Sequence, residues 1–123
     1  MSDDGVRDET FIKVAGKSAE GVYATGPADV SSHPVTRKYR QAYVKKYGVE
    51  PGPFFDNAVA AALALTNSIR VAGSTETEDI ARTLQIQATA TPFGDIKFDK
   101  NGDAIGVGYS LYVVKKGKFV QVD

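Results

Sequence analysis

The segment from Phe54 to Ala72 most constrains the fold of this sequence, because it predicts a long helix with almost no polar face. Alanine and leucine dominate it, and Gly73 follows directly, as glycine often does at the C-terminus of a helix. A helix that is apolar nearly all round is usually buried on most sides. We therefore expect neighbouring elements to pack closely over its small side chains.

Shorter elements surround this helix and predict an α/β fold. Apolar spacing and capping residues predict three further helices: 7–15, 34–47 capped by Ser32 or His33, and a third that Ser74 or Thr75 caps and that runs to about residue 86. Four strands are expected: 21–25 ended by Gly26-Pro27, 94–98, 107–114 and 119–122. On the strand 107–114 we expect Tyr109, Leu111 and Val113 to share one face. The segment 89–92 breaks the helical pattern.

Composition excludes several classes of function. The chain is 42% hydrophobic and 24% charged, as in ordinary globular domains, which argues against disorder and against a membrane span. Its net charge is zero, so no long-range field favours nucleic acid. It contains no cysteine, which excludes disulfides, thiolate catalysis and cysteine-ligated zinc. The start Met1-Ser2-Asp3-Asp4 is not a secretory signal, so any such signal is expected upstream of this chain.

The first candidate site is the acidic loop Asp3-Asp4-Gly5-Val6, before which we expect no strand. Ligands of α/β proteins gather at loops just outside the ends of strands. A carboxylate here can accept hydrogen bonds from a ligand ammonium, and such charge-assisted bonds contribute about 1.5–3 kcal/mol. The alternative, favoured by spacing alone, is that these acids only cap the helix that follows.

Phe54 and Phe55 form the second candidate, because an aromatic residue at a helix start can wall an apolar pocket. Aromatic residues are more often part of the core, and we expect this for at least one of the two.

No other motif predicts catalysis, a metal site or a cofactor. Asp99, Asn101 and Asp103 have the spacing that opens a calcium loop, but Ala104 and Ser110 occupy its sixth and twelfth positions. The pair Asn101-Gly102 favours a hairpin turn instead. The single histidine, His33, has no nucleophile motif to accompany it, and a capping role is expected. We therefore expect neither an enzyme nor a metal-binding protein.

The order of these features resembles the carboxy-terminal third of bacterial branched-chain amino-acid (Leu/Ile/Val) ABC-transporter substrate-binding proteins, which are bilobed type I periplasmic binding proteins. The residues that carry the resemblance are Asp3-Asp4-Gly5-Val6, the run 14–25 with Ala15-Gly16-Lys17-Ser18-Ala19-Glu20-Gly21, the helix 54–64, and Phe93-Gly94-Asp95-Ile96-Lys97-Phe98-Asp99 with Asn101-Gly102-Asp103. The resemblance covers nearly the whole chain. It implies an α/β fragment of that fold, with helices on a small sheet that ends in antiparallel strands.

The resemblance also assigns roles to two residues. In these receptors an acidic residue before Gly-Val binds the ligand ammonium, and Asp4 stands there, although the familiar receptor has glutamate. A phenylalanine at the start of the alanine-rich helix contacts the ligand side chain, and Phe54 matches it. Where many relatives have Tyr-Asp-Ala, this chain has Asp56-Asn57-Ala58. Residues 1–123 are expected to be one truncated segment, with about 1–25 and 107–123 in the second lobe and about 26–106 in the first.

The implied function is capture of a branched-chain or related apolar amino acid in the periplasm by lobe closure, for delivery to the permease of an ABC importer. An alternative of the same fold is a ligand-sensing regulatory module that acts on a protein partner. The isolated segment, without the strands that should cover its helices, is expected to bind amino acids poorly. It is also expected to self-associate as a homo-oligomer through exposed apolar surface.

Overall fold

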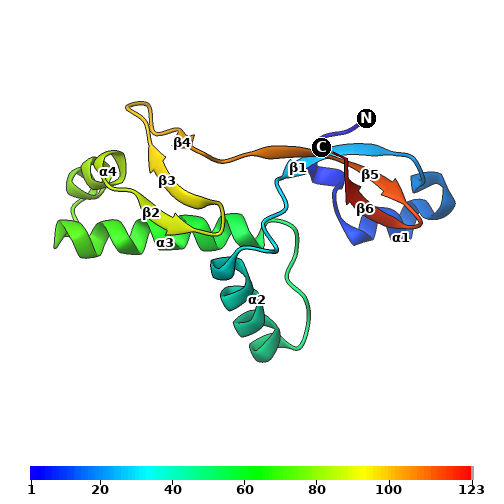
Figure 1. Cartoon of the computed structure of the whole chain (residues 1–123), viewed down its shortest axis with the longest axis horizontal. Helices are drawn as coiled ribbons and strands as arrows, with labels where there is room; N and C mark the ends of the chain where they lie inside the picture. The colour runs from blue at the N-terminus through cyan, green and yellow to red at the C-terminus, as the bar shows by residue number, and fades with distance from the viewer. Residues whose placement is uncertain (123) are drawn as a thin grey trace. The chain divides into compact units, whose positions relative to one another are not determined.

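The computed structural model describes residues 1–122, which form two compact units (Figure 1). The first unit combines residues 1–29 with the chain from Gly108 onward, and the second consists of residues 30–107. Along the described residues, the first strand is followed by three successive helices and then by five successive strands, which makes a mixed α/β chain.

The first unit is built on an antiparallel sheet in the order β1-β5-β6. Its strands are β1 (Tyr23–Pro27), β5 (Tyr109–Lys115) and β6 (Lys118–Gln121). Two residues, Lys116 (φ 53°) and Gly117 (φ 70°), connect β5 to β6 with the left-handed backbone that a tight hairpin requires. Their N–H groups donate to the Glu20 carboxylate at 2.7 and 3.3 Å. Glu20 therefore anchors the hairpin turn from a distant part of the sequence.

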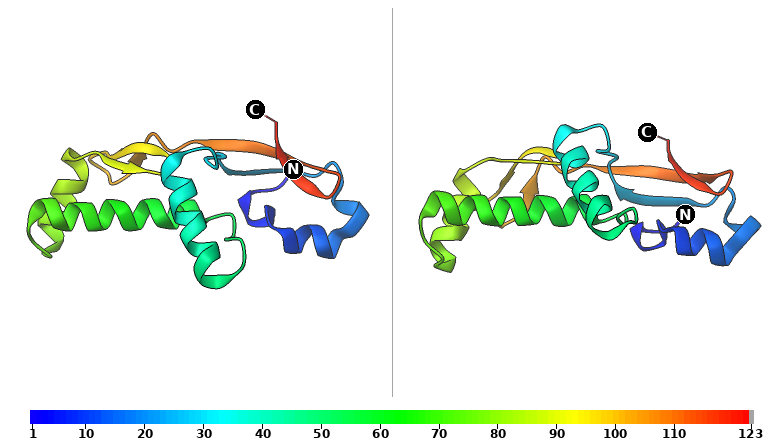
Figure 2. Two further views of the ribbon diagram at one scale, coloured as in Figure 1. Left: turned by 60° about the horizontal axis from the view of Figure 1, so that its bottom comes forward. Right: turned by 90° about the horizontal axis from the view of Figure 1, so that it is seen from below.

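Helix α1 (Glu9–Ala15) lies along one face of this sheet (Figure 2). The short helices η1 (Asp4–Val6) and η2 (Gly16–Ala19) flank it. The Phe11 ring of α1 lies 6.3 Å from the Phe119 ring of β6, which places an aromatic contact between helix and sheet. Gly16 ends α1, as predicted.

The strands of the first unit differ from the prediction in two ways. β1 continues through Gly26 and Pro27, which we expected to end it. Pro27 is the last residue of the strand, where its missing N–H is tolerated. Gly26 has a packing role, because a Cβ at this position would lie 2.5 Å from Cδ of Arg7. On β5, Tyr109, Leu111 and Val113 are alternate residues and share one face, as expected, but burial is not confined to one face of the strand. Val113 and Val114 point to opposite faces and are both buried, so both sides of this central strand are covered.

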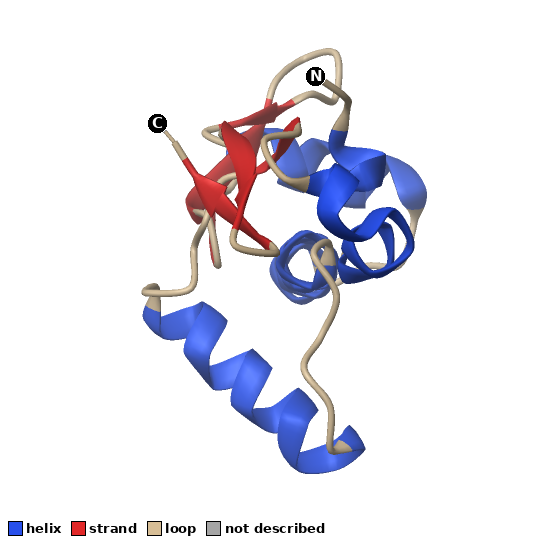
Figure 3. Cartoon of the chain, turned by 90° about the vertical axis from the view of Figure 1, so that its right-hand side faces the viewer, coloured by secondary structure: helices blue, strands red, loops and turns tan. Residues whose placement is uncertain are grey.

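The second unit consists of three helices and a small antiparallel sheet in the order β2-β3-β4. The elements are α2 (Pro34–Tyr47), α3 (Phe55–Ala72), α4 (Thr77–Ile86), β2 (Thr89–Thr91), β3 (Gly94–Phe98) and β4 (Ala104–Ile105). Helix α3 packs against α4 and β2, whereas α2 stands apart from the sheet of this unit (Figure 3). The strand β2 occupies the segment in which the sequence indicated only the end of helical structure.

Helix ends in this unit follow the predicted chemistry. Nδ1 of His33 accepts a hydrogen bond from Val35 N–H at 3.3 Å, so His33 caps α2. Gly48 and Gly73 end α2 and α3 in the left-handed conformation. The start of α4 is the exception: its N-cap residue is Glu76, which makes no side-chain capping bond, so the prediction that Ser74 or Thr75 caps this helix is wrong. The Ser74 hydroxyl instead accepts from Glu76 N–H at 3.1 Å in the turn before the helix.

Helix α3 is not buried on most sides within this chain. Its buried residues, Asp56, Ala60, Ala64 and Ser68, follow one narrow stripe at a spacing of four. Leu65 and Val71 are about half exposed, at 48% and 47%. The apolar sequence on the other sides of the helix therefore faces outward. None of the described helices combines the length and hydrophobicity that crossing a lipid bilayer requires.

Candidate functional site

The acidic loop follows a single β-bridge residue that the sequence did not reveal. Ser2 pairs in parallel with Ala24 of β1, since Ser2 N–H donates to Tyr23 O at 2.8 Å and Thr25 N–H donates to Ser2 O at 3.3 Å. Among the described residues no regular strand precedes the loop, as expected, but this isolated bridge does. The loop leaves the carboxyl end of a parallel pairing, which is the position at which α/β folds bind ligands.

Two neighbouring aspartates cap the helices of this loop. Oδ1 of Asp3 accepts a hydrogen bond from Gly5 N–H at 3.1 Å and caps η1. Oδ1 of Asp8 accepts from Thr10 N–H at 2.6 Å and caps α1. The side-chain and backbone hydrogen bonds from Thr10 hold the pKa of the Asp8 carboxyl below its ordinary value of 3.8. Asp8 was not among the residues predicted from the sequence, although its position directly before α1 is the ordinary signal for a cap.

Asp4 is left without a capping role. It is half-buried in η1, and its backbone oxygen accepts from Arg7 N–H at 3.1 Å. Among the described residues, no hydrogen bond or ion pair engages its carboxylate. The capping alternative therefore applies to Asp3 and not to Asp4.

The structure separates the two phenylalanines of the second candidate. Phe54 is the N-terminal cap residue of α3 and is 45% exposed. Phe55 packs edge-on against Tyr43 of α2, with ring centroids 5.0 Å apart. The prediction that one of the two is a packing residue thus fits Phe55. Asp4 belongs to the first unit and Phe54 to the second.

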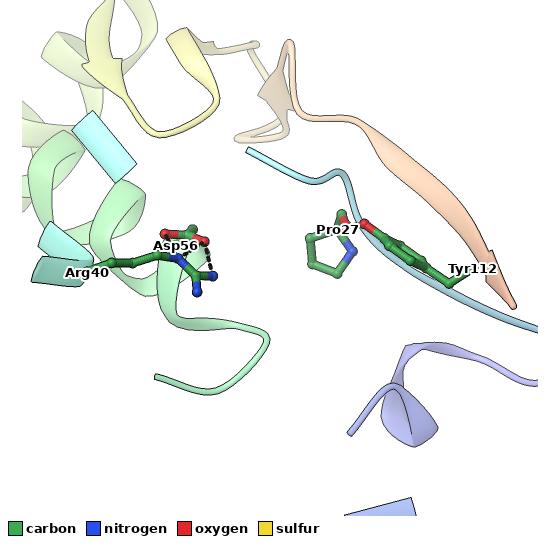
Figure 4. A network of polar contacts seen from close by, with 4 residues as sticks. All are labelled: Pro27, Arg40, Asp56 and Tyr112. Carbon is green, nitrogen blue, oxygen red and sulfur yellow. Dashed lines mark hydrogen bonds and ion pairs between the residues drawn. The ribbon is translucent and has the colours of Figure 1, made fainter. Parts of the chain in front are cut away.

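Asp56 makes a buried ion pair that the sequence did not predict. Nη2 and Nε of Arg40 on α2 donate to its Oδ2 at 2.6 and 3.2 Å (Figure 4). The Asp56 side chain is 7% exposed and that of Arg40 is 31% exposed. The pair connects α2 to the first turn of α3, next to Phe54 and Phe55. This ion pair is a structural contact, and the Asp56 carboxylate is not a free acid available for catalysis.

The remaining candidates also have structural roles. Asp99 Oδ1 accepts from the N–H groups of Asn101 and Asp103 at 2.8 and 2.9 Å, which stabilises the turn before β4. No cluster of three potential metal ligands occurs in residues 1–122. These residues therefore form no second candidate ligand site beside the loop at Asp4.

A hollow of about 540 Å³ lies in the second unit, between the C-terminal half of α3 and the segment 87–90. Asn67 and Arg70 line it and are engaged within it: Arg70 Nη2 donates to Asn67 Oδ1 at 2.6 Å, and Asn67 Nδ2 donates to Thr89 Oγ1 at 3.0 Å. Neither Asp4 nor Phe54 lines this hollow.

Comparison with known sequences identifies the family. The periplasmic binding protein family matches residues 4–118. The leucine-, isoleucine-, valine-, threonine- and alanine-binding protein of Pseudomonas aeruginosa is 28% identical over 91% of this chain and 30% of its own length. The Leu/Ile/Val-binding protein of Escherichia coli is 26% identical over the same shares. The chain thus spans about a third of the length of these curated relatives.

Comparison with solved structures gives the same fold. A leucine binding protein from Thermotoga maritima matches with a TM-score of 0.78 and 31% identity, over 98% of this chain and 35% of that one. A solute binding protein from Rhodopseudomonas palustris in complex with benzoate matches with a TM-score of 0.74 at 17% identity, over 98% and 34%, which supports the fold alone. These relatives are binding proteins and not enzymes. The chain has the fold of part of a type I periplasmic binding protein, and it belongs to the periplasmic binding protein family.

Proposed function

We propose that this chain is the ammonium-binding segment of a longer solute-binding protein that captures a branched-chain or related apolar amino acid. The observation that carries the proposal is the Asp4 carboxylate: it lies at the carboxyl end of a parallel strand pairing, half-buried, while Asp3 and Asp8 take the capping roles. An acid with no structural partner at the position where the fold binds ligands is suited to an α-ammonium group.

In this proposal Phe54 contacts the apolar side chain of the amino acid. Its exposure of 45%, at the start of α3, leaves the ring available to a ligand, whereas Phe55 is engaged by Tyr43. Residues 1–25 and 107–123 would belong to one lobe of the longer protein, and residues 26–106 to the other. The division of the chain after Asp29 and before Gly108 supports that assignment.

The proposed mechanism is closure of the two lobes around the amino acid in the periplasm, followed by delivery to the permease of an ABC importer. Closure would expel water and strengthen the contact between Asp4 and the ammonium. No bond would be made or broken. The names of the curated relatives, which bind leucine, isoleucine and valine, support the class of ligand.

Calorimetric titration of the longer protein with leucine, isoleucine and valine tests this function. We expect tight binding of at least one of them, and a loss of more than tenfold on Asp4→Ala, because the lost ammonium contact is charge-assisted. Asp3→Ala is the matched control: it removes the neighbouring carboxylate and one capping bond, and it should leave affinity within about threefold. Equal effects of the two substitutions would remove Asp4 from the site.

We also propose that the 123-residue chain alone self-associates. Large apolar side chains of α3 and its neighbours are about half exposed or more, among them Leu65, Val71 and Ile86. Exposed apolar patches of this kind drive association. Sedimentation at increasing concentration should give a mass above that of a monomer, and a constant 13.1 kDa species would contradict the proposal.

A further inference from the structure

The chain leaves the first unit after β1 and returns to it before β5, and these two crossing segments lie side by side. β1 ends at Pro27 opposite Tyr109, the first residue of β5. The pairing continues one step past the strand, because Ala28 N–H donates to Gly108 O at 3.2 Å. The outgoing and returning segments are therefore joined up to Ala28 and Gly108.

Tyr112 binds the peptide group between Pro27 and Ala28 from its other side. Its hydroxyl donates to Pro27 O at 2.6 Å, and its side chain is among the most buried of the first unit, with the residue 3% exposed (Figure 4). The oxygen of Pro27 and the N–H of Ala28 belong to one peptide group. That group is thus fixed at both ends, by Tyr112 and by Gly108.

Gln121 of β6 adds a second attachment. Its Oε1 accepts from Asp29 N–H at 3.3 Å and lies 3.4 Å from the Tyr112 hydroxyl. The attachments at Pro27, Ala28 and Asp29 therefore come from the neighbouring strands of the same unit.

Arg7 keeps the Tyr112 ring in place. Its guanidinium lies over the ring, with Cζ 3.8 Å from the centroid, and its aliphatic stem crosses Gly26 at a distance that leaves no room for a Cβ. A stacked guanidinium and a buried ring allow few alternative rotamers. The hydroxyl is consequently directed at Pro27 by its surroundings.

We propose that Tyr112 and Gln121 form a clamp that locks the crossing segment Pro27–Asp29 onto the first unit. The clamp is made entirely of residues of the first unit. It does not depend on the proposed ligand or on the role of Asp4, and amide exchange tests it without any ligand.

Amide hydrogen exchange of the whole chain, followed by NMR, tests the clamp in Tyr112→Phe. This substitution removes only the hydroxyl and keeps the ring that contacts Arg7. We expect exchange at the Ala28 amide to accelerate about three- to tenfold, the effect of losing one intramolecular hydrogen bond. Exchange at the Val114 amide, which donates to Val22 O inside the sheet, should stay within about twofold.

Two matched comparisons complete the test. Tyr109→Phe removes the hydroxyl of a residue that is 72% exposed on the same strand, and it should leave Ala28 exchange unchanged. Gln121→Met removes the acceptor for Asp29 and should accelerate Asp29 exchange about two- to threefold, whereas Gln121→Glu keeps an acceptor and should not. The clamp is overturned if Tyr112→Phe leaves Ala28 exchange as it was. It is also overturned if Val114 accelerates equally, or if Tyr109→Phe has the same effect as Tyr112→Phe.

Discussion

The two units of this chain differ in what fills their interiors. In the first unit the buried residues are mainly apolar and lie on the sheet and the turn before it: Ala19, Ala24, Gly26, Pro27, Tyr112, Val113 and Val114, with Ser110 as a polar exception. In the second unit the buried residues are mainly small or polar: Thr36, Asp56, Ala60, Ala64, Ser68, Thr83, Thr89, Thr91, Pro92 and Ile96. Most other large apolar side chains of the second unit are partly or largely exposed.

The stability of the two units therefore depends on different interactions. Burial of apolar surface contributes about 25 cal/mol per Å², so burial of apolar side chains stabilises the sheet of the first unit. In the second unit some buried hydroxyls are held by single hydrogen bonds: Thr91 Oγ1 donates to Gly94 O at 2.8 Å, and Thr83 Oγ1 donates to Asp79 O at 2.8 Å. Each such bond contributes only about 1 kcal/mol net. Within residues 1–122, the buried hydroxyls of Thr36 and Ser68 have no such partner.

The largest expected effect compares one residue of each unit. Tyr112→Ala removes a buried ring and its hydrogen bond, and it should lower the free energy of unfolding of the first unit by about 3–5 kcal/mol. Leu65→Ala on α3 should cost about 1 kcal/mol or less, because Leu65 is 48% exposed and leaves no cavity. Urea unfolding followed by circular dichroism and tyrosine fluorescence measures both, since the chain has no tryptophan.

Similar losses of unfolding free energy in Tyr112→Ala and Leu65→Ala would contradict this difference between the units. A Leu65→Ala cost near that of Tyr112→Ala would show that the outward face of α3 is buried in solution. Self-association through that face predicts such a cost only at high protein concentration, so the measurement is repeated at two concentrations.

The second effect tests the polar packing of the second unit. Asp56→Ala should cost about 2 kcal/mol, because it leaves Arg40 without its partner beside α3. Asp79→Ala is the control: its pair with Arg82 is 3.8 Å long and exposed, so it should cost under about 0.5 kcal/mol. Thermal unfolding of both variants checks the difference, and equal shifts would show that the Arg40–Asp56 pair has no special weight.

The smallest effect concerns the cap of α1. The pKa of Asp8 is lowered in the folded chain, so its contribution to stability is present above the ordinary value of 3.8 and is lost as the pH falls through the lower folded value. Asp8→Asn keeps a capping oxygen without this titration. Unfolding measured across acid pH should show the first unit losing this contribution below about pH 4 in the wild type and not in the variant. Parallel pH profiles for the two proteins would contradict the assignment.

Much of the fold could be predicted from local chemistry. His33, Gly48 and Gly73 mark helix ends because caps and left-handed glycines act within a few residues of the chain. The alternation in 94–98 likewise predicted β3. The loop with Asp4 could be singled out because its acids and glycine are adjacent.

What the sequence did not predict depends on pairing across long separations. Ser2 pairs with Ala24, and Thr89 to Thr91 form β2 only because β3 lies opposite. The acids at positions 3, 4 and 8 can cap in several ways, and only the structure showed that Asp3 and Asp8 do so while Asp4 does not. The exposure of α3 was mispredicted, because an apolar pattern shows which side chains a helix could bury. It does not show whether this chain contains elements that cover them.

The most direct test of the account is the ammonium contact itself. The longer protein is titrated with leucine and with 4-methylpentanoate, which is leucine without its amino group, before and after Asp4→Asn. If Asp4 binds the ammonium, the wild type should prefer leucine by at least about tenfold, and the variant should reduce that preference to about threefold or less. A preference that is the same in both proteins would contradict the proposed site.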